Sequence, residues 1–365
     1  MNKKNITVLF QNPDTLDSIE INIENKNYYI RDIAEQIIDK FNLKSPPIFF
    51  TIFKDKPTEN QYLEENDKLI DVLEKRLDEK IPIWWRSSDL NEDIMYNLRV
   101  NRFIKSGYKI DIIKNKNIMI VGIGLLGSEI ALHCATIGIK NITVIDYGSV
   151  DWYNIYRQPL YTKNDVFKRK VDVAKNKLES IGGINVNSIY IEIPNFNSLN
   201  IEKDVVLKNI NILEKAVEKN DIIITSLDTF SARMIIQILA LVHNKILINT
   251  AAGLIGGIIQ IIRPFQDPCI GCGTFYDRNQ ETGACTLASF GTPKIIAGLC
   301  IDVLLDLIEN RKIEFNYLKF LPNYTIETKT FFKADNCQFC GENGIASVYN
   351  KNYKKELLNW LFNNH

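Results

Sequence analysis

Two pairs of cysteines have the spacing of a metal site. Cys269 and Cys272 form one Cys-x-x-Cys pair, and Cys337 and Cys340 form the other. Two thiolates separated by two residues can chelate one ion, and four thiolates form the tetrahedral sulfur shell that Zn²⁺ favours. A closed shell leaves no position for a reactant, so we expect a structural zinc ion that joins two distant segments. The alternative, two coincidental pairs of buried cysteines, requires the same short spacing twice.

A second group of residues has the spacing of a nucleotide site. Gly122, Gly124 and Gly127 follow the apolar run Ile118 to Val121, and Asp146 ends a second apolar run further along the chain. In a βαβ unit, glycines at this spacing form a tight turn that approaches phosphates, and an acid about twenty residues later contacts ribose hydroxyls. The stretch therefore predicts strand, glycine turn, helix and strand with a bound nucleotide.

Two cations that a dinucleotide does not require follow Asp146. Arg157 lies in the run Asn154 to Gln158, and Lys170 opens a helical run. A triphosphate carries about four negative charges and requires cations beyond a glycine turn, which Arg157 and Lys170 could supply. The alternative is that both lie on solvated surface, as most Arg and Lys side chains do.

A third apolar run ends on an acid. Asp221 to Leu227 predicts a buried strand, and Asp228 lies at its carboxyl end. Open α/β sheets bind ligands at this edge, where a carboxylate is well placed to hold Mg²⁺ against phosphate oxygens. An Asp at this position is equally typical of an N-cap for the next helix.

Two further residues are candidates for chemistry. Cys285 ends a polar stretch between the cysteine pairs, and a thiol in such a loop can be a nucleophile. Arg102 follows an expected helix, where an isolated arginine is usually solvated. Cys134 and Cys300 lie in apolar runs and are expected to pack in the interior.

The composition indicates a soluble protein of two domains. The chain has 365 residues, more than one hydrophobic core usually supports, and its 44 basic residues balance its 44 acidic residues. No net charge therefore attracts nucleic acid or an anionic membrane. The start of the chain lacks the apolar core of a secretory signal, and the apolar runs are interrupted by polar residues. We expect a cytoplasmic protein with no nucleic-acid or membrane partner.

The first 85 residues differ in pattern from the rest. Alternating runs predict a hairpin, an amphipathic run predicts a helix, and two further runs predict strands. In chain order these runs are Ile6–Gln11, Ser18–Ile23, 31–41, 48–53 and Lys68–Leu73. The order is typical of a β-grasp, ubiquitin-like domain, with a winged helix or another peptide-binding module as the alternative. We expect a small α+β domain over 1–88, an α/β domain over 89–350 and a C-terminal helix over 351–365.

Taken together, the motifs resemble the ThiF, MoeB and HesA family of ubiquitin-activating-enzyme-like adenylyltransferases over residues 95–345. The matching features are the glycines of GIGLLG, the acid of VIDYG, the NxxRQ run, Lys170, the segment LDTFSAR and both cysteine pairs. A lone glycine motif is weak, whereas all of these in order are specific. Two departures are Gly148, where many relatives have a second acid, and Phe103, which replaces the Gln of a YNRQ segment.

The resemblance implies a Rossmann-like adenylation domain with a mainly parallel sheet and structural zinc. It implies that the glycines, Asn154 and Gln158 bind ATP, and that Asp146 binds the ribose. It further implies that Arg157 and Lys170 contact the phosphates and that Asp228 positions Mg²⁺. Arg102 would be an arginine finger that reaches the nucleotide of a second subunit, which implies a homodimer. Cys285 corresponds to a cysteine that some members use as a thioester or persulfide nucleophile and others do not need.

The implied reaction activates a carboxylate with ATP and releases pyrophosphate. The leading hypothesis is adenylation of the C-terminal carboxylate of a small ubiquitin-like or sulfur-carrier protein. The main alternative resembles the MccB branch, in which an extra N-terminal domain clamps a ribosomal peptide. A nicotinamide-dependent oxidoreductase would also use the glycine turn and Asp146, but it leaves Arg157, Lys170 and the cysteine pairs unexplained. An inactive dimeric scaffold is disfavoured by the intact Arg157, Lys170 and Asp228.

Overall fold

The chain forms two compact units, Met1–Asn101 and Arg102–His365, and each is described here by itself. A computed structural model describes residues 6–13, 15–23, 28–43, 46–55, 60–76, 78, 82–87, 96, 100, 103–196, 202–254, 256–272, 288–347 and 349–363. Arg102 and Cys285 lie outside these ranges, as does most of the helix expected before Arg102. The expected boundary at residue 88 stays a prediction.

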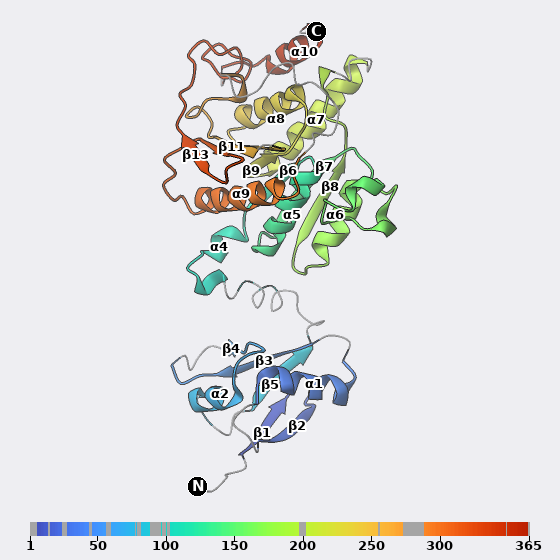
Figure 1. Ribbon diagram of the computed structural model, residues 1–365, viewed down its shortest axis with the longest axis vertical. Helices are drawn as coiled ribbons and strands as arrows, with labels where there is room; N and C mark the ends of the chain where they lie inside the picture. The colour runs from blue at the N-terminus through green and yellow to red at the C-terminus, as the bar shows by residue number, and fades with distance from the viewer. Residues whose placement is uncertain are drawn as a thin grey trace. The chain divides into compact units, whose positions relative to one another are not determined.

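The first unit is a five-stranded mixed sheet with the helix α1 packed on one face (Figure 1). The strand order is β2-β1-β5-β3-β4, in which β1 and β5 run parallel and the other pairs antiparallel. Ile33 and Ile37 of α1 are fully buried against Phe10, Phe49 and Trp85 of the sheet. The elements are β1 Ile6–Gln11, β2 Ser18–Ile23, α1 Ile30–Phe41, β3 Pro47–Ile52, β4 Asn60–Tyr62, α2 Leu69–Lys75 and β5 Ile83–Ser87.

One expected strand of this unit is wrong. The run Lys68–Leu73 lies mostly in the helix α2, and the last strand of the sheet is β5. Leu69 and Val72 of α2 are buried and Leu73 packs beside them, which is the three-to-four spacing of a helix. A short apolar run supports either a strand or one helical turn, and packing against the core decides between them.

The second unit is an eight-stranded sheet between two layers of helices. The order is β13-β12-β11-β10-β9-β6-β7-β8. The five strands from β10 to β8 are parallel to their neighbours, whereas β11, β12 and β13 are joined antiparallel. The sheet is therefore mixed, with parallel strands in the half that contains the glycine turn. The strands are β6 Asn117–Val121, β7 Asn141–Asp146, β8 Asn185–Tyr190, β9 Ile222–Thr225, β10 Ile246–Gly253, β11 Gly256–Ile262, β12 Tyr317–Phe320 and β13 Ile326–Lys329.

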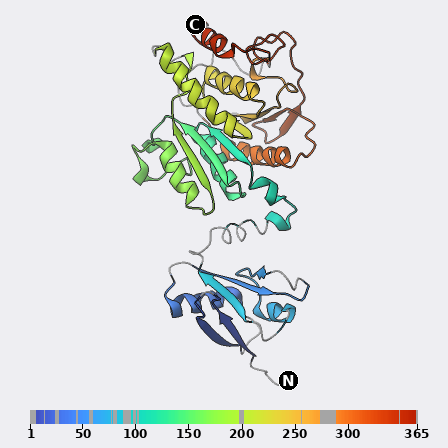
Figure 2. The same cartoon turned by 180° about the vertical axis from the view of Figure 1, so that it is seen from behind.

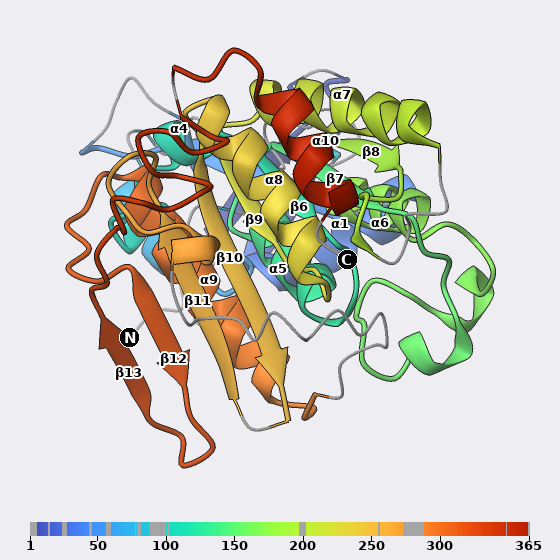
Figure 3. The ribbon, with the colours of Figure 1, turned by 90° about the horizontal axis from the view of Figure 1, so that it is seen from above.

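Helices cover both faces of this sheet, as seen from behind (Figure 2) and from above (Figure 3). The helices α5, α6 and α9 contact one face, and α7 and α8 cover the other, with α10 packed on α7. Their bounds are α4 Ile110–Ile113, α5 Leu125–Thr136, α6 Lys170–Glu179, α7 Lys203–Lys219, α8 Phe230–Val242, α9 Thr292–Ile308 and α10 Tyr353–Asn363. Within the described part of the chain, every helix is too short or too polar to cross a bilayer.

Candidate nucleotide site and a cluster of four cysteines

The glycine turn joins β6 to α5 at the carboxyl edge of the parallel strands. Gly122 has a φ of +88°, and a Cβ there would lie 2.4 Å from the Ser226 backbone oxygen. A Cβ on Gly127 would lie 1.8 Å from the Gly122 backbone oxygen, so the first turn of α5 packs directly on the glycine turn. Two of the three glycines therefore permit backbone contact. Gly124 differs, because no described atom lies within 4 Å of a Cβ built on it, which leaves room for a ligand.

The amino end of α5 is suited to an anion. Gly124 is the N-cap of this helix and has no side chain to cap it. The first N–H groups of a helix lack partners within the helix, and they carry the positive end of its dipole. Phosphate groups bind at such helix ends without further machinery. The turn and the helix end together therefore fit the predicted phosphate site.

Asp146 ends β7 and reaches back to the neighbouring glycine turn. One carboxylate oxygen accepts the Ile123 N–H at 2.8 Å, and the other accepts the Gly148 N–H at 2.6 Å. The parallel pairing of Val121 with Ile145 puts the two strand ends side by side. Asp146 thus lies where a ribose-binding acid is expected, and this role stays a prediction.

Lys170 and Asp228 lie in the same charged neighbourhood as Asp146. The backbone N–H of Lys170 donates to the Gly148 carbonyl at 3.0 Å, and its Nζ lies 3.6 Å from where a Gly148 Cβ would be. Such a Cβ would also lie only 3.0 Å from the Asp146 carboxylate, so glycine at 148 leaves space for the lysine and the acid.

The pKa of Asp228 is shifted by burial and by the charges of Asp146 and Lys170. Burial raises the pKa of this carboxyl, the charge of Arg233 lowers it, Asp146 raises it and Lys170 lowers it again. The charges of Asp146 and Lys170 are therefore close enough to Asp228 to change its pKa. Carboxylate oxygens are the hard ligands that Mg²⁺ prefers, so the two acids fit the predicted ion.

Arg233 holds the segment that carries Asp228. Its side chain is buried and donates to the Thr250 carbonyl at 2.9 Å, to the Leu227 carbonyl and to the side-chain oxygen of Asn249. The Leu227 carbonyl immediately precedes Asp228, so Arg233 fixes the backbone from which the acid projects. The sequence pattern included Arg233 without a role, because two of its partners, Asn249 and Thr250, lie on β10, further along the chain.

The run from Asn154 to Gln158 is partly buried. Asn154 is buried, and its side-chain oxygen accepts the Asp151 N–H at 2.9 Å. The guanidinium of Arg157 lies 5.9 Å and 5.5 Å from the ring centres of Tyr153 and Tyr156. Gln158 is only 2% exposed, and its amide oxygen has no hydrogen-bond donor in the described part of the chain. A buried acceptor left without a donor costs free energy, and a nucleotide offers hydroxyl and amine donors that fit it.

The four paired cysteines meet in one cluster, although the two pairs are 68 residues apart. The sulfurs of Cys269 and Cys337 are 3.5 Å apart, those of Cys272 and Cys340 are 3.2 Å apart, and all four lie within 4.8 Å of one another. Tetrahedral zinc with bonds of about 2.3 Å separates its sulfurs by roughly 3.8 Å, so the cluster fits that geometry.

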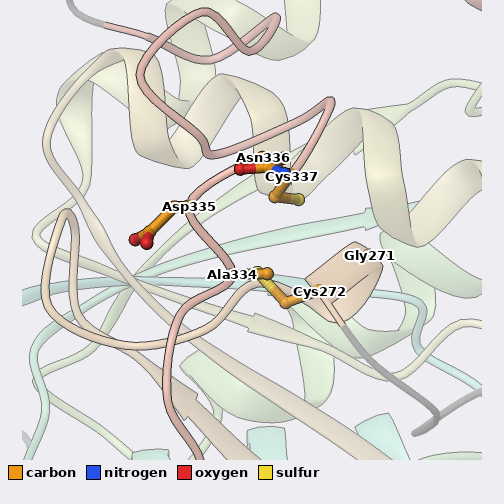
Figure 4. A pocket seen from close by; sticks show the side chains of 6 residues that line it. All are labelled: Gly271, Cys272, Ala334, Asp335, Asn336 and Cys337. Carbon is orange, nitrogen blue, oxygen red and sulfur yellow. The ribbon is translucent and has the colours of Figure 1, made fainter.

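The two cysteine turns approach from separate segments beside a small cavity (Figure 4). The Gly341 N–H donates to the Cys337 carbonyl at 2.8 Å and closes the second turn. Phe339, between Cys337 and Cys340, packs on Gly271 of the first turn and lies 5.4 Å from the ring of Trp360 in α10. The cluster thereby joins the segment after β11 to the segment that carries Cys337 and Cys340. Phe339 connects both segments to α10.

These features define a Rossmann-like α/β domain with a glycine turn and strand-end acids. The chain belongs to the ThiF family, whose model matches residues 96–340. This confirms the family that the motifs resemble. It also agrees with the position of the second structural unit, which begins at Arg102.

The relatives include ubiquitin-like modifier-activating enzymes named ATG7. The Candida glabrata enzyme is 26% identical over 289 residues, which is 73% of this chain and 46% of that protein. A Saccharomyces cerevisiae enzyme is 23% identical over 281 residues, 70% of this chain and 45% of that protein. The chain thus spans about half the length of these curated relatives.

Solved structures show a similar fold. The microcin C7 biosynthetic enzyme MccB, in complex with N-formylated MccA, has a TM-score of 0.55 and 20% identity, covering 70% of this chain and 78% of that chain. The protein PaaA has a TM-score of 0.52 and 18% identity, covering 79% of this chain and 99% of that chain. These similarities establish the fold.

Proposed function

We propose that the chain is an adenylyltransferase that activates the C-terminal carboxylate of a small protein or peptide with ATP. The observation that supports this most is the grouping of Asp146, Lys170 and Asp228 beside an uncapped helix end, at the carboxyl edge of the sheet. Two relatives are named ubiquitin-like modifier-activating enzymes, and E. coli MccB has been solved with ATP and with MccA.

The reaction joins a carboxylate oxygen to the α-phosphorus of ATP while the bond to the bridging oxygen of the β-phosphate breaks. Pyrophosphate leaves with the electron pair of that bond, and the acyl group gains AMP as a leaving group. Because phosphate charge builds up on the bridging oxygen, donors and cations that already face it lower the barrier.

The chain's own residues would divide this work. The helix end at Gly124 and the ammonium of Lys170 would hold the phosphates, with Arg157 as a second cation. Asp146 would accept hydrogen bonds from the ribose hydroxyls. The buried amide oxygen of Gln158 would accept a hydrogen bond from a donor on the nucleotide. Asp228 would hold Mg²⁺, which when bound neutralises phosphate charge. Binding and alignment of the two substrates supply much of the rate.

A nicotinamide-dependent oxidoreductase is the weaker alternative. It would use the glycine turn and Asp146, but it would not need Lys170 and Asp228 next to each other. ATP is therefore the nucleotide that accounts for the larger set of contacts.

The first unit is proposed to have a ubiquitin-like β-grasp fold and to hold the substrate or a partner. Its strand order, with β1 and β5 parallel at the centre and one helix across the face, supports the fold. The substrate would be a small ubiquitin-like or sulfur-carrier protein. A ribosomal peptide is the alternative, which the fold similarity to MccB favours.

A homodimer is proposed because aromatic side chains are exposed next to the nucleotide residues. Trp152, Tyr153, Tyr156 and Phe167 are between 52% and 82% exposed. Aromatic residues are enriched at protein interfaces. Arg102 would act as the arginine finger of the second subunit, and Cys285 would be a nucleophile only if the activated carboxylate is transferred to a thiol.

Binding of ATP tests the nucleotide assignment. We expect the full chain to bind Mg·ATP and not NADH in isothermal titration calorimetry. We expect Lys170→Ala to weaken Mg·ATP binding by about tenfold, because a charge-assisted contact contributes about 1.5 kcal/mol or more. Lys175→Ala is the matched control on the same helix, because Lys175 is 41% exposed and pairs with Glu179 at 3.7 Å. Binding of NADH in preference to Mg·ATP, or equal ATP affinity in Lys170→Ala, would contradict the assignment.

A further inference from the structure

Tyr161 connects two parts of the candidate nucleotide site that are far apart in the chain. Its hydroxyl donates to the backbone carbonyl of Ile123 at 2.7 Å, across 38 residues of sequence, and the side chain is only 3% exposed. Ile123 is the residue between Gly122 and Gly124. A tyrosine that lies between Arg157 and Lys170 in the chain therefore contacts the glycine turn itself.

The peptide groups of Ile123 are held from two sides. The Asp146 carboxylate accepts its N–H at 2.8 Å, and Tyr161 donates to its carbonyl. The Gly122 N–H also donates to the Ile145 carbonyl at 2.8 Å. Because these groups are satisfied inside the protein, the direction of the turn is set before any nucleotide binds.

Tyr161 also closes the run that contains the predicted phosphate cation. Its backbone N–H donates to the Gln158 carbonyl at 3.3 Å, and the Gln158 N–H donates to the Asn154 carbonyl at 2.9 Å. The run from Asn154 to Tyr161 is thus a compact turn whose last side chain is anchored on the glycine turn. Movement of one part would displace the other.

The phenol remains a donor over the physiological pH range. Burial raises the pKa of Tyr161 well above its ordinary value, and the charge of Asp146 raises it further. An ionised phenolate would repel the Ile123 carbonyl and the Asp146 carboxylate together. The contact therefore does not depend on pH near neutrality.

We propose that Tyr161 is a positioning residue for the nucleotide: its hydroxyl sets the direction of the glycine turn and fixes that turn to the Asn154–Gln158 run, so that phosphate donors and cations face the same space. The choice of ATP as ligand rests on the proposed function. The positioning role itself applies to whichever nucleotide this turn binds.

Removal of the hydroxyl alone tests this role. In Tyr161→Phe the ring remains and the Ile123 carbonyl loses its donor, so we expect the Kd for Mg·ATP to rise by about five- to tenfold in titration calorimetry of the full chain. We also expect faster amide hydrogen exchange over residues 122–127. Tyr324→Phe is the control, because Tyr324 is 84% exposed on the β12–β13 hairpin and should leave both measurements unchanged.

The outcomes separate this inference from the proposed function. A Tyr161→Phe protein with a lower melting temperature but unchanged nucleotide affinity and unchanged exchange at the turn would overturn the inference and leave a structural tyrosine. If the parent binds NADH and not Mg·ATP, the proposed function fails, and the same comparison with NADH decides the role of Tyr161. If the parent binds neither nucleotide, hydrogen exchange at the turn decides the role of Tyr161. Exchange that is as slow in Tyr161→Phe as in the parent overturns the inference, and faster exchange supports it.

Discussion

Substitution of Asp228 by alanine is expected to abolish ATP–pyrophosphate exchange, with a loss of at least about a hundredfold, because metal-assisted charge stabilisation contributes several kcal/mol to such reactions. Asp228 lies in the segment between β9 and α8, interacts with the charges of Asp146 and Lys170, and follows the Leu227 carbonyl that Arg233 holds. Burial and the charge of Asp146 raise the pKa of Asp228, so a bound cation would offset the repulsion between the two carboxylates. The measurement is exchange of labelled pyrophosphate into ATP, in the presence of a partner that supports it in the parent.

The fold should survive this substitution. Burial raises the pKa of Asp228, so the folded protein does not gain stability from its charge, and alanine should leave the melting temperature close to that of the parent. Asp111→Ala is the matched control, because Asp111 is an exposed acid that pairs with Lys114 at 2.5 Å. Full exchange in Asp228→Ala would show that another residue holds the magnesium ion.

Loss of the cysteine cluster is expected to have the largest effect on stability. We expect about one zinc ion per chain in freshly purified protein and much less in Cys337→Ser, with a loss of about 4 kcal/mol or more in the free energy of unfolding. For a domain of this size that corresponds to a fall in melting temperature on the order of 10 °C. The physical reason is that the cluster joins two distant segments and supports the contact of Phe339 with Trp360.

Zinc content and thermal unfolding measure this effect. Cys300→Ala is the control, since Cys300 is a fully buried thiol on α9 outside the cluster and should leave the zinc content unchanged. Packing loss at Cys300 would lower stability without changing the metal. A parent protein with far less than one zinc ion per chain, or a Cys337→Ser protein as stable as the parent, would refute a structural zinc site.

The central βαβ unit could be predicted from sequence because its signals are local. The apolar run before Gly122, the glycine spacing and the acid at Asp146 each depend on neighbours in the chain, and β6, α5 and β7 lie where they were expected. The cysteine pairs could also be predicted as metal ligands from sequence, since chelation fixes their spacing. Their meeting across 68 residues confirms the inference that both belong to one cluster.

The contacts that aim the site could not be predicted in this way. Tyr161 and Arg233 act through carbonyl groups on other elements, Ile123 in one case and Leu227 and Thr250 in the other. No period or spacing in sequence indicates such a partner. The same limit explains the error at Lys68–Leu73, where a short apolar run fitted both a strand and a helix, and burial of Leu69 and Val72 decided for a helix.

The mixed sheet is a related case. The strands β10 and β11 form an antiparallel hairpin over residues 246–262. The expected mainly parallel sheet extends only from β10 to β8, because β11 turns back and β12 and β13 continue antiparallel. Strand direction depends on the connections between strands, which are not visible in the apolar pattern of each strand.

Pyrophosphate exchange with a defined carboxylate is the most direct test of the proposed adenylation. Candidates are small proteins that end in Gly-Gly and short peptides encoded beside this chain, each prepared with a free and with an amidated C-terminus. We predict exchange of labelled pyrophosphate into ATP with the free carboxylate, none with the amidated partner, and none in Asp228→Ala. Exchange that is equal with the amidated partner, or a chain that oxidises NADH and exchanges no pyrophosphate, would contradict it.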